Sequence, residues 1–278
     1  MAGRQAEGEV LVVAGGKGGV GKSNFALNLG IQLSRLGLRT ILLDADFGHA
    51  NVDILLGIAP QRGLVGLLDR SRAVEDLLSE GPEGLWVICG ISGMRQARSV
   101  CETDPLHGTE RISVPTLGAL LRLRRSCEVL VVDCSADVTG AAATFALACD
   151  RLILITTPEP TAVADSYATL KLLFQRGFCA RAGVVVNMAA RASDAVDAVR
   201  RLQRVAEQFL GLSLENLGFV PLDRHVAKAV REQEPFTTRY PRCAASTGIE
   251  VIARRLRFVG DKRPGQVGVW GRVASLFF

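Results

Sequence analysis

A run of residues near the amino terminus has the composition and spacing of a phosphate-binding loop. Gly16, Lys17, Gly18, Gly19, Val20, Gly21, Lys22 and Ser23 satisfy the pattern GxxxxGK[ST]. Glycines let backbone N–H groups turn inward around phosphate oxygens. The lysine of such a loop reaches the β- and γ-phosphates, and the hydroxyl that follows it ligates Mg²⁺. We therefore predict a nucleotide site in which Lys22 binds phosphate, Ser23 binds the metal and Asn24 adjoins the nucleotide. The alternative is a flexible glycine-rich turn.

The elements around this loop are those that the motif requires. The short β-branched run Glu9–Ala14 predicts a strand before it, and the sequence from Lys22 to about Leu36 predicts a helix after it. The amino terminus of that helix adds a favourable dipole for an anion. Further strands are expected at 39–43, 85–89, 128–132, 151–156 and 181–187, with helices at 115–126, 140–149, 161–176 and 192–210.

The predicted strands are almost continuously apolar instead of alternating. This pattern indicates burial on both faces and therefore a mostly parallel sheet between two helical layers, a three-layer α/β/α fold of the P-loop NTPase type. Residues 93–108 have little pattern and are expected to form a loop. We expect one nucleotide-binding domain at 1–259, then a flexible spacer and an amphipathic tail at 260–278.

Composition narrows the class of protein. The 278 residues are 48% hydrophobic and 22% charged, which suits a large buried core. The seven cysteines include no CxxC pair, so we expect neither a disulfide framework nor a cysteine-based metal site, as in a reducing cytosol. There is no basic-then-apolar leader and no stretch of the ~20 apolar residues that span a bilayer. These features predict a cytoplasmic protein that is at most attached to a surface.

Carboxylates follow two of the predicted strands. Asp44 and Asp46 end the strand at 39–43, and Asp133 follows the apolar run at 129–132. Ligands of open α/β sheets bind at the carboxyl ends of strands, so these side chains are candidates for the nucleotide and its metal. Asp133 has the position of a carboxylate that holds Mg²⁺ through water. For Asp44 and Asp46 the alternative is capping of the following turn.

The additional lysine of the loop, Lys17, makes the sequence KGGVGKS, which resembles the deviant Walker A motif of the MinD/ParA family of the SIMIBI class. The resemblance implies an ATPase that uses ATP and Mg²⁺ and forms an ATP-dependent homodimer, in which Lys17 crosses to the partner's nucleotide. It also implies that Asp46 orients the attacking water, that Asp44 lies near the Mg²⁺ shell, and that Lys17, Lys22 and Asp46 are the catalytic residues. The alternative for Lys17 is a loop lysine that faces solvent.

Two later positions are candidates for recognition of the base. Asn187 closes the strand at 181–187 and is followed by Met-Ala-Ala, without the Lys-x-Asp that reads guanine. This difference favours adenine, with the Asn187 amide at the edge of the base. By resemblance to the family, the sequence Val-Pro-Leu-Asp at 220–223 is a second base-flanking loop, which makes Pro221 and Asp223 candidate nucleotide-binding residues.

Within the family, residues 42–57, 81–93 and 156–173 resemble the flagellar-number regulators of the FlhG/FleN type, and the similarity runs from about residue 10 to residue 256. The segment 157–168 discriminates best. The tail at 269–278 places apolar residues on one helical face after a basic spacer, as membrane-targeting helices do. The resemblance implies peripheral attachment to the anionic inner face of the cell membrane and partners such as FlhF or a transcription regulator, with nucleic acid less favoured. Packing of the tail on its own domain is the alternative.

The chain departs from the family pattern in two places. Asp137 replaces the glycine expected after Asp133, and only Arg4–Glu7 remains of an amino-terminal segment that acts on FlhF. A carboxylate near the γ-phosphate favours slow hydrolysis, or an ATP-binding module without hydrolysis as an alternative function. A DNA-partitioning protein of the ParA type is the other alternative, because the region from Arg239 onward is basic.

Overall fold

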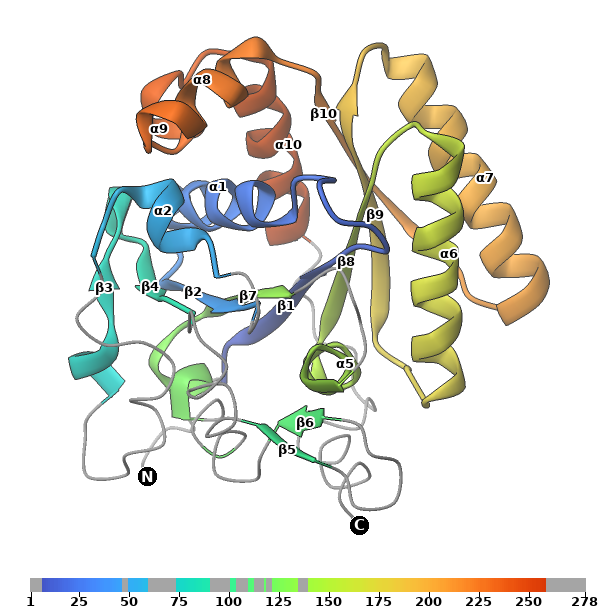
Figure 1. The fold of residues 1–278 in the computed structure, drawn as a ribbon, viewed down its shortest axis with the longest axis horizontal. Helices are drawn as coiled ribbons and strands as arrows, with labels where there is room; N and C mark the ends of the chain where they lie inside the picture. Colours follow the sequence, from blue (N-terminus) through green and yellow to red (C-terminus); the bar gives the residue numbers. More distant parts are fainter. Residues whose placement is uncertain are drawn as a thin grey trace.

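The computed structural model describes residues 7–46, 50–59, 74–90, 101–103, 110–112, 118, 122–134 and 140–258. They contain an eight-stranded sheet in the order β10-β9-β8-β1-β7-β2-β4-β3 (Figure 1). Its strands are β1 (Glu9–Ala14), β2 (Thr40–Ala45), β3 (Ser79–Glu80), β4 (Trp86–Ile88), β7 (Val129–Cys134), β8 (Arg151–Thr156), β9 (Arg181–Ala189) and β10 (Glu215–Pro221). All neighbouring strands are parallel except β3, which runs antiparallel to β4 at one edge.

The centre of the sheet consists of the strands that the sequence marks as continuously apolar. β2, β7 and β8 are buried at every position. β1 lies between β7 and β8, with Val12 opposite Val132 on one side and Leu152 on the other. Strands without polar alternation can be buried only if both faces of the sheet are covered. The predicted parallel sheet is therefore confirmed.

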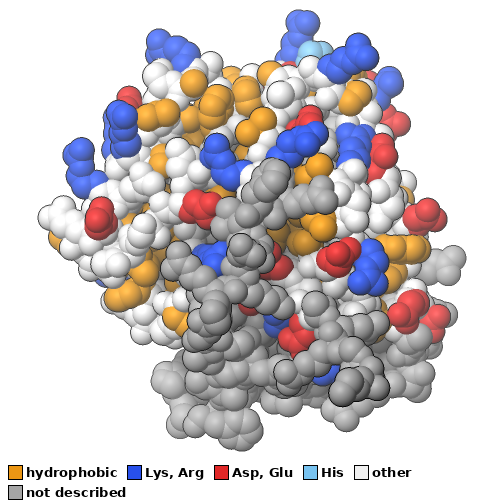
Figure 2. All heavy atoms as spheres, turned by 180° about the vertical axis from the view of Figure 1, so that it is seen from behind, with side chains coloured by type: hydrophobic (Ala, Val, Ile, Leu, Met, Phe, Trp, Pro, Cys, Tyr) orange, Lys and Arg blue, Asp and Glu red, His pale blue; other side chains and the backbone are white. Residues whose placement is uncertain are grey.

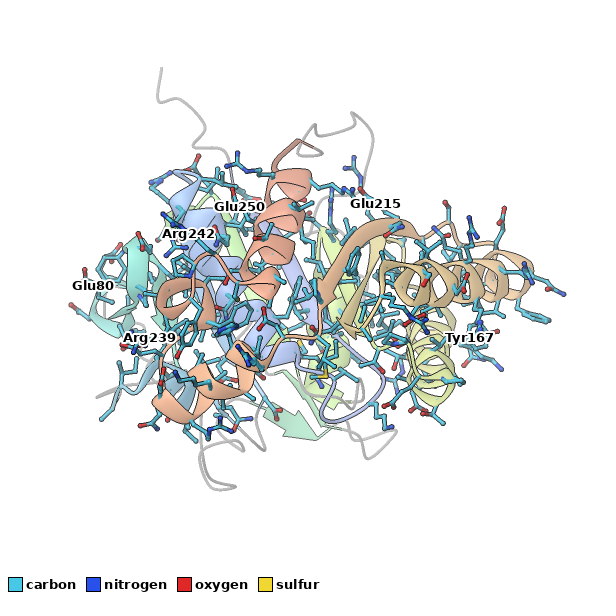
Figure 3. All side chains as sticks on the ribbon, turned by 90° about the horizontal axis from the view of Figure 1, so that it is seen from above. Glu80, Tyr167, Glu215, Arg239, Arg242 and Glu250 are labelled. Atoms are coloured by element: carbon cyan, nitrogen blue, oxygen red, sulfur yellow. The ribbon has the colours of Figure 1, made fainter. Side chains whose placement is uncertain are left out.

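Helices cover both faces of the sheet. One layer contains α1 (Lys22–Arg35), α2 (Val52–Leu56), α8 (Arg224–Glu232), α9 (Phe236–Arg239) and α10 (Ala244–Phe258). The other contains α5 (Gly140–Ala148), α6 (Pro160–Gln175) and α7 (Ala192–Leu210). Each layer has its own core: Phe25 and Ile249 pack in the first, and Leu170 and Leu202 in the second. Seen from above, Tyr167 of α6 and Arg239 of α9 lie on opposite sides of the molecule (Figure 3). The α/β/α prediction is confirmed.

Two expectations need correction. Residues 93–108 are not all loop, because β5 (Cys101–Thr103) pairs with β6 (Glu110–Ile112) in a small antiparallel sheet. Strands of three residues are joined by backbone hydrogen bonds and need no apolar run, so the pattern does not reveal them. The elements after residue 210 are also absent from the sequence-based prediction. β10 shifts register twice and holds Gly218 at φ 122°, which interrupts any regular strand pattern.

Other expectations lie partly or wholly outside the described residues. Of the helix predicted at 115–126, residues 122–126 are helical and most of the remainder is not described. Asp137 and the tail at 260–278 are not described either, so the boundary between domain and tail remains a prediction. In the described part of the chain, no helix combines the length and apolarity needed to cross a bilayer.

A buried amide links the helix after the phosphate loop to the carboxyl-terminal part of the chain. Asn28 of α1 is fully buried, and its Oδ1 accepts hydrogen bonds from the N–H and the hydroxyl of Thr237 in α9, at 2.9 and 2.8 Å. Its amide nitrogen donates to the Asn24 carbonyl at 2.8 Å. Because an unpaired buried amide is costly, these bonds fix α9 against α1.

Candidate functional site: a phosphate loop and three carboxylates

The loop between β1 and α1 has the conformation that its glycines permit. Gly19 and Gly21 have φ values of 81° and 85°, a region that residues with a Cβ rarely adopt. Gly21 is the N-cap of α1, so the free N–H groups of the first helical turn open toward the loop. A loop of this shape before a helix amino terminus is suited to phosphate.

Gly16 is required because α6 lies against the loop. A Cβ on Gly16 would lie 2.1 Å from the backbone carbonyl oxygen of Asp165. Backbone atoms of a helix cannot yield as a flexible side chain can. The close approach of the two segments therefore depends on the absence of a side chain. Gly18, at the tip of the same loop, has no atom within 4 Å of the corresponding position.

We expect Gly16→Ala to lower the free energy of unfolding of the nucleotide-free protein by about 2 kcal/mol or more, the cost of overpacking a tight site. Gly18→Ala is the matched control and should change it by less than about 0.5 kcal/mol. Urea unfolding of both variants checks this, and equal stabilities would show that the loop does not rest on α6 as described.

The two lysines of the loop have opposite environments. Lys22 is only 8% exposed, and its Nζ donates to the Lys17 carbonyl at 3.3 Å. Burial lowers the pKa of Lys22, while the charges of Asp133 and Asp46 act to raise it. The side chain of Lys17 is 46% exposed and makes a 3.5 Å ion pair with Glu159, the N-cap residue of α6. Lys22 thus faces the interior of its own site, whereas Lys17 lies on the surface.

Asp133 is a buried carboxylate without a hydrogen bond of ordinary geometry to either oxygen. Burial raises its pKa to about 8 and the charge of Asp44 adds to the rise, while Ser23 and Lys22 act to lower it. The Ser23 hydroxyl is thus close enough to influence the carboxylate without forming a well-directed bond. Two buried acceptor oxygens without donors are costly in a folded protein. They fit a site that a hydrated cation completes.

Asp44 and Asp46 lie at the end of β2, where Asp44 is directly opposite Asp133 in the register of β2 and β7. The Asp44 carboxylate is fully buried and accepts hydrogen bonds from the N–H groups of Asp46, Asn51 and Val52, at 3.1, 3.1 and 3.2 Å. Burial raises its pKa to about 6, and those three bonds act to lower it. Asp44 therefore caps the turn before α2, which is the alternative role that the sequence left open for it. Its role near Mg²⁺ stays a prediction.

The residues proposed for the base lie at the ends of the next two strands. Asn187 ends the buried part of β9, and its amide nitrogen donates to the loop carbonyl of Val20 at 2.8 Å. The backbone N–H of Leu222 donates to the Ala189 carbonyl at 2.9 Å, which places the segment after β10 beside β9. Asp223 caps α8 by accepting from the His225 N–H at 2.9 Å. The contacts of these residues with a base remain predictions.

An apolar groove lies beside this segment and not at the phosphate loop. It has a volume of about 560 Å³ between β10, α7 and α10, and Pro221, Val196 and Val251 are among its lining residues. On the face seen in Figure 2, hydrophobic side chains gather in the upper part and are bordered by Lys and Arg side chains. The phosphate loop lies between β1 and α1, and none of its residues is among those that line this groove.

Comparison with known proteins identifies the family. The family described as CobQ/CobB/MinD/ParA nucleotide binding domain matches residues 11–236. The chain belongs to this MinD/ParA family. It is 34% identical to the antiactivator FleN of Pseudomonas aeruginosa over 89% of this chain and 86% of that protein. It is 28% identical to the flagellum site-determining protein YlxH of Helicobacter pylori over 87% of this chain and 80% of that protein.

Solved structures of MinD have the same fold. The cell division ATPase MinD of Pyrococcus furiosus superimposes with a TM-score of 0.74 at 19% identity, covering 91% of this chain and all of that one. MinD of Pyrococcus horikoshii, solved with Mg-ADP, gives a TM-score of 0.73 at 19% identity over 92% and 99%. The MinD/ParA chain described here is accordingly a P-loop ATPase, with ATP and Mg²⁺ as its cofactors.

The residues of this MinD/ParA chain fit those cofactors. The loop glycines leave room for phosphate, Lys22 would supply a positive charge to it, and Ser23 and Asp133 would supply oxygens for Mg²⁺. Bound Mg²⁺ neutralises phosphate charge during transfer to water. The individual roles of Lys17, Asp46 and Asn187 are not tested by the geometry and stay predictions.

Sequence reasoning missed three residues that shape the site. Glu159 pairs with Lys17, and Asp165 supplies the backbone against which Gly16 packs. Both lie in the segment 157–168, which the sequence marks as discriminating without giving it a structural role. The third is Gly90, where a Cβ would lie 3.0 Å from the Asp44 carboxyl carbon. A single glycine after a strand does not indicate, from sequence alone, that the backbone there lies close to the Asp44 carboxyl group.

Proposed function

We propose that this protein is an ATP-dependent switch that dimerises with ATP, attaches to the membrane as a dimer and restrains the number or placement of flagella. The similarity to FleN and YlxH supports the flagellar role. In this proposal ATP hydrolysis returns the protein to a monomer in solution. Lys22, Ser23 and Asp133 hold Mg·ATP, and Asp46 orients the attacking water.

The proposal rests on the different environments of the two loop lysines. Lys22 is buried and already faces the phosphate site of its own chain, so a second inward cation is not needed. Lys17 is exposed on the loop, where it pairs with Glu159, whose side chain is 66% exposed. An exposed pair of this kind contributes little stability, so Lys17 is available to the phosphates of a second copy.

We expect the wild-type protein to be a dimer with saturating Mg·ATP and a monomer with ADP or without nucleotide. Lys17→Ala should bind ATP but dimerise at least about tenfold more weakly, because a charge that contacts phosphate across an interface is lost. Light scattering after size exclusion measures the mass, with Lys171→Ala as a control that removes an exposed lysine of α6. The switch is excluded if wild-type and Lys17→Ala are equally monomeric with Mg·ATP.

Membrane attachment rests on the tail at 269–278, which lies outside the described residues. One short amphipathic segment binds a bilayer only marginally, whereas two on one dimer gain roughly 10²–10⁴ in avidity. Dimerisation alone would therefore control attachment. Sedimentation with anionic liposomes tests this: the full chain should sediment with ATP and not with ADP, and a chain without residues 266–278 should not sediment in either case.

Assays on the same wild-type and variant proteins distinguish two other functions. A protein that only binds ATP would give equal, background phosphate release from wild-type and Asp46→Ala chains. A DNA-partitioning protein would be retained on DNA with ATP, and salt would weaken the retention steeply. Either result would replace the proposed membrane switch.

A further inference from the structure

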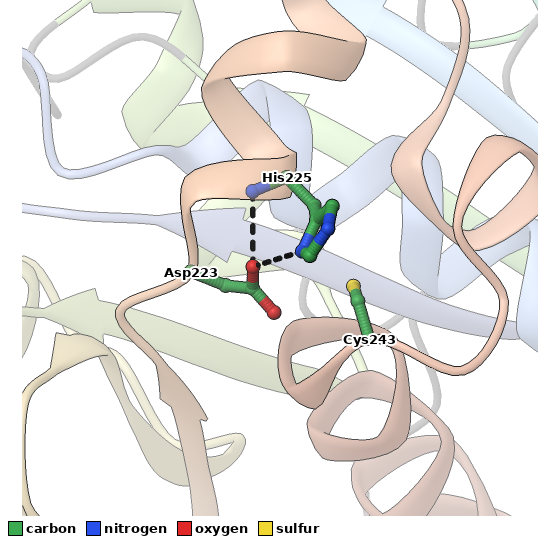
Figure 4. Close-up of side chains that lie close together, drawn as sticks. All are labelled: Asp223, His225 and Cys243. Atoms are coloured by element: carbon green, nitrogen blue, oxygen red, sulfur yellow. Dashed lines mark hydrogen bonds and ion pairs between the residues drawn. The ribbon is translucent and has the colours of Figure 1, made fainter.

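A histidine, a cysteine and an aspartate from two segments of the chain meet at the corner between α8 and α10. Asp223 precedes α8, His225 lies in its first turn, and Cys243 immediately precedes α10 (Figure 4). One oxygen, nitrogen or sulfur atom from each lies within 4.8 Å of the other two. The cysteine pattern did not predict this cluster, because Cys243 is distant in the sequence from Asp223 and His225.

From this arrangement we infer that Asp223, His225 and Cys243 form a binding site for a zinc-class divalent ion. Oxygen, imidazole nitrogen and thiolate sulfur are the donors that Zn²⁺ takes in proteins, and sites with three protein ligands complete a tetrahedron with water. The inference does not depend on ATP binding or on dimerisation.

The carboxylate is held in place for such a role. Asp223 has a side chain that is 8% exposed, and its Oδ2 accepts a 3.2 Å bond from the Ala245 N–H while its Oδ1 accepts from the His225 N–H. Burial acts to raise the pKa of Asp223, but these bonds and those from the His225 and Cys243 side chains lower it to about 2. The group is therefore an anion at neutral pH, and Oδ2 keeps a lone pair free for an ion.

The imidazole and the thiol are also oriented. His225 Nδ1 lies 2.7 Å from Asp223 Oδ1, and its ring packs 4.9 Å from the ring of Tyr240. The Cys243 sulfur lies 3.2 Å from the Ser246 hydroxyl oxygen, whose proton is donated to the Tyr240 carbonyl, and 3.4 Å from the Ser246 nitrogen, whose N–H can stabilise a thiolate. Donors around a tetrahedral Zn²⁺ are about 3.3–3.8 Å apart, given bonds of 2.0–2.3 Å. If the His225 ring moved slightly away from Asp223, the ion could enter between them. Bonds from both residues to the ion would then replace the hydrogen bond between Nδ1 and Oδ1.

Binding would convert the Cys243 thiol into a thiolate and release its proton to solvent. The ion would join the start of α8 to the start of α10. It would thereby fix the segment after β10, whose Leu222 N–H is bonded to β9. The consequence in solution is a metal-dependent increase in the stability of this corner.

Cobalt is the probe that distinguishes this site from the nucleotide site. We expect one equivalent of Co²⁺, added to the full-length protein without nucleotide, to give a thiolate-to-metal charge-transfer band and the intense visible bands of a tetrahedral ion. Zn²⁺ should remove them. Cys243→Ser should abolish the charge-transfer band, and His225→Gln should weaken Co²⁺ binding at least about tenfold. Cys179→Ser removes an exposed thiol and should change neither.

A second measurement on the wild-type protein avoids reliance on the folding of the variants. One equivalent of Zn²⁺ should slow alkylation of Cys243 by iodoacetamide at least about tenfold and leave Cys179 unaffected. The site is excluded if no charge-transfer band forms, if the band persists in Cys243→Ser, or if Zn²⁺ does not protect Cys243. The three residues would then serve only as a hydrogen-bonded cap.

Discussion

Lys22→Ala is expected to lower ATP turnover by roughly 100-fold or more, as the loss of a preorganised charge at a phosphate does. The ammonium group of Lys22 is 8% exposed and shares its surroundings with Asp133 and Asp46. Burial lowers the pKa of Lys22, and the charges of Asp133 and Asp46 act against that effect. A charge already desolvated and aimed at the site needs no reorganisation when phosphate arrives.

The measurement is steady-state phosphate release together with the ATP dissociation constant. Lys171→Ala provides the control, because Lys171 is an exposed lysine of α6 outside the phosphate loop. Unchanged turnover in Lys22→Ala would mean that the buried lysine is structural and that the phosphate site lies elsewhere.

The second large expected effect is a dependence of the free energy of unfolding on pH. Asp133 has a pKa raised by burial to about 8, and Asp44 has a pKa raised to about 6. An unfolded aspartate has a pKa of about 3.9, so the folded protein binds more protons than the unfolded chain between about pH 4 and pH 8. The free energy of unfolding of the nucleotide-free protein must therefore fall as the pH rises through this range, on the order of a few kcal/mol.

Asp133→Asn removes the larger part of this dependence, so its stability should change much less between pH 5 and pH 8. The same substitution should weaken the contribution of Mg²⁺ to nucleotide binding, because an amide is a poorer ligand than a carboxylate. Urea unfolding in EDTA at several pH values tests the first point, with the exposed Asp197→Asn as control. If the free energy of unfolding of the wild-type protein is constant or rises from pH 5 to pH 8, burial does not disfavour the charged form of Asp133 in the nucleotide-free protein.

The sequence predicts most directly the phosphate loop, because the loop is one continuous segment. The loop from Gly16 to Ser23 lies between β1 and α1, and its spacing alone specifies a backbone cradle. Asp133 could be placed beside Asp44 because strands of a parallel sheet end at one edge, where α/β sheets bind their ligands, while its contact with Mg²⁺ stays a prediction. The same rule located Asn187, at the end of the buried part of β9.

The part that sequence misses depends on contacts between distant segments. Glu159 and Asp165 reach the loop because α6 packs against it, and nothing in their local sequence specifies that partner. Asp44 was placed correctly at the strand end, but its three backbone donors come from a turn whose shape cannot be predicted from composition. The strand β10 was missed because register shifts around Gly218 interrupt its pattern, and α8 and α9 were missed because they are only nine and four residues long.

The position of β1 has a consequence for how the chain acquires its activity. β1 is synthesised first, yet both of its neighbours, β7 and β8, begin more than about a hundred residues later, and Asn28 finds its partner Thr237 at a separation of 209 residues. Contacts of such high order form slowly and require most of the chain. A nascent chain on the ribosome therefore cannot fix α9 against α1, the helix that follows the loop, until Thr237 has emerged, so this support of the nucleotide site is among the last to form.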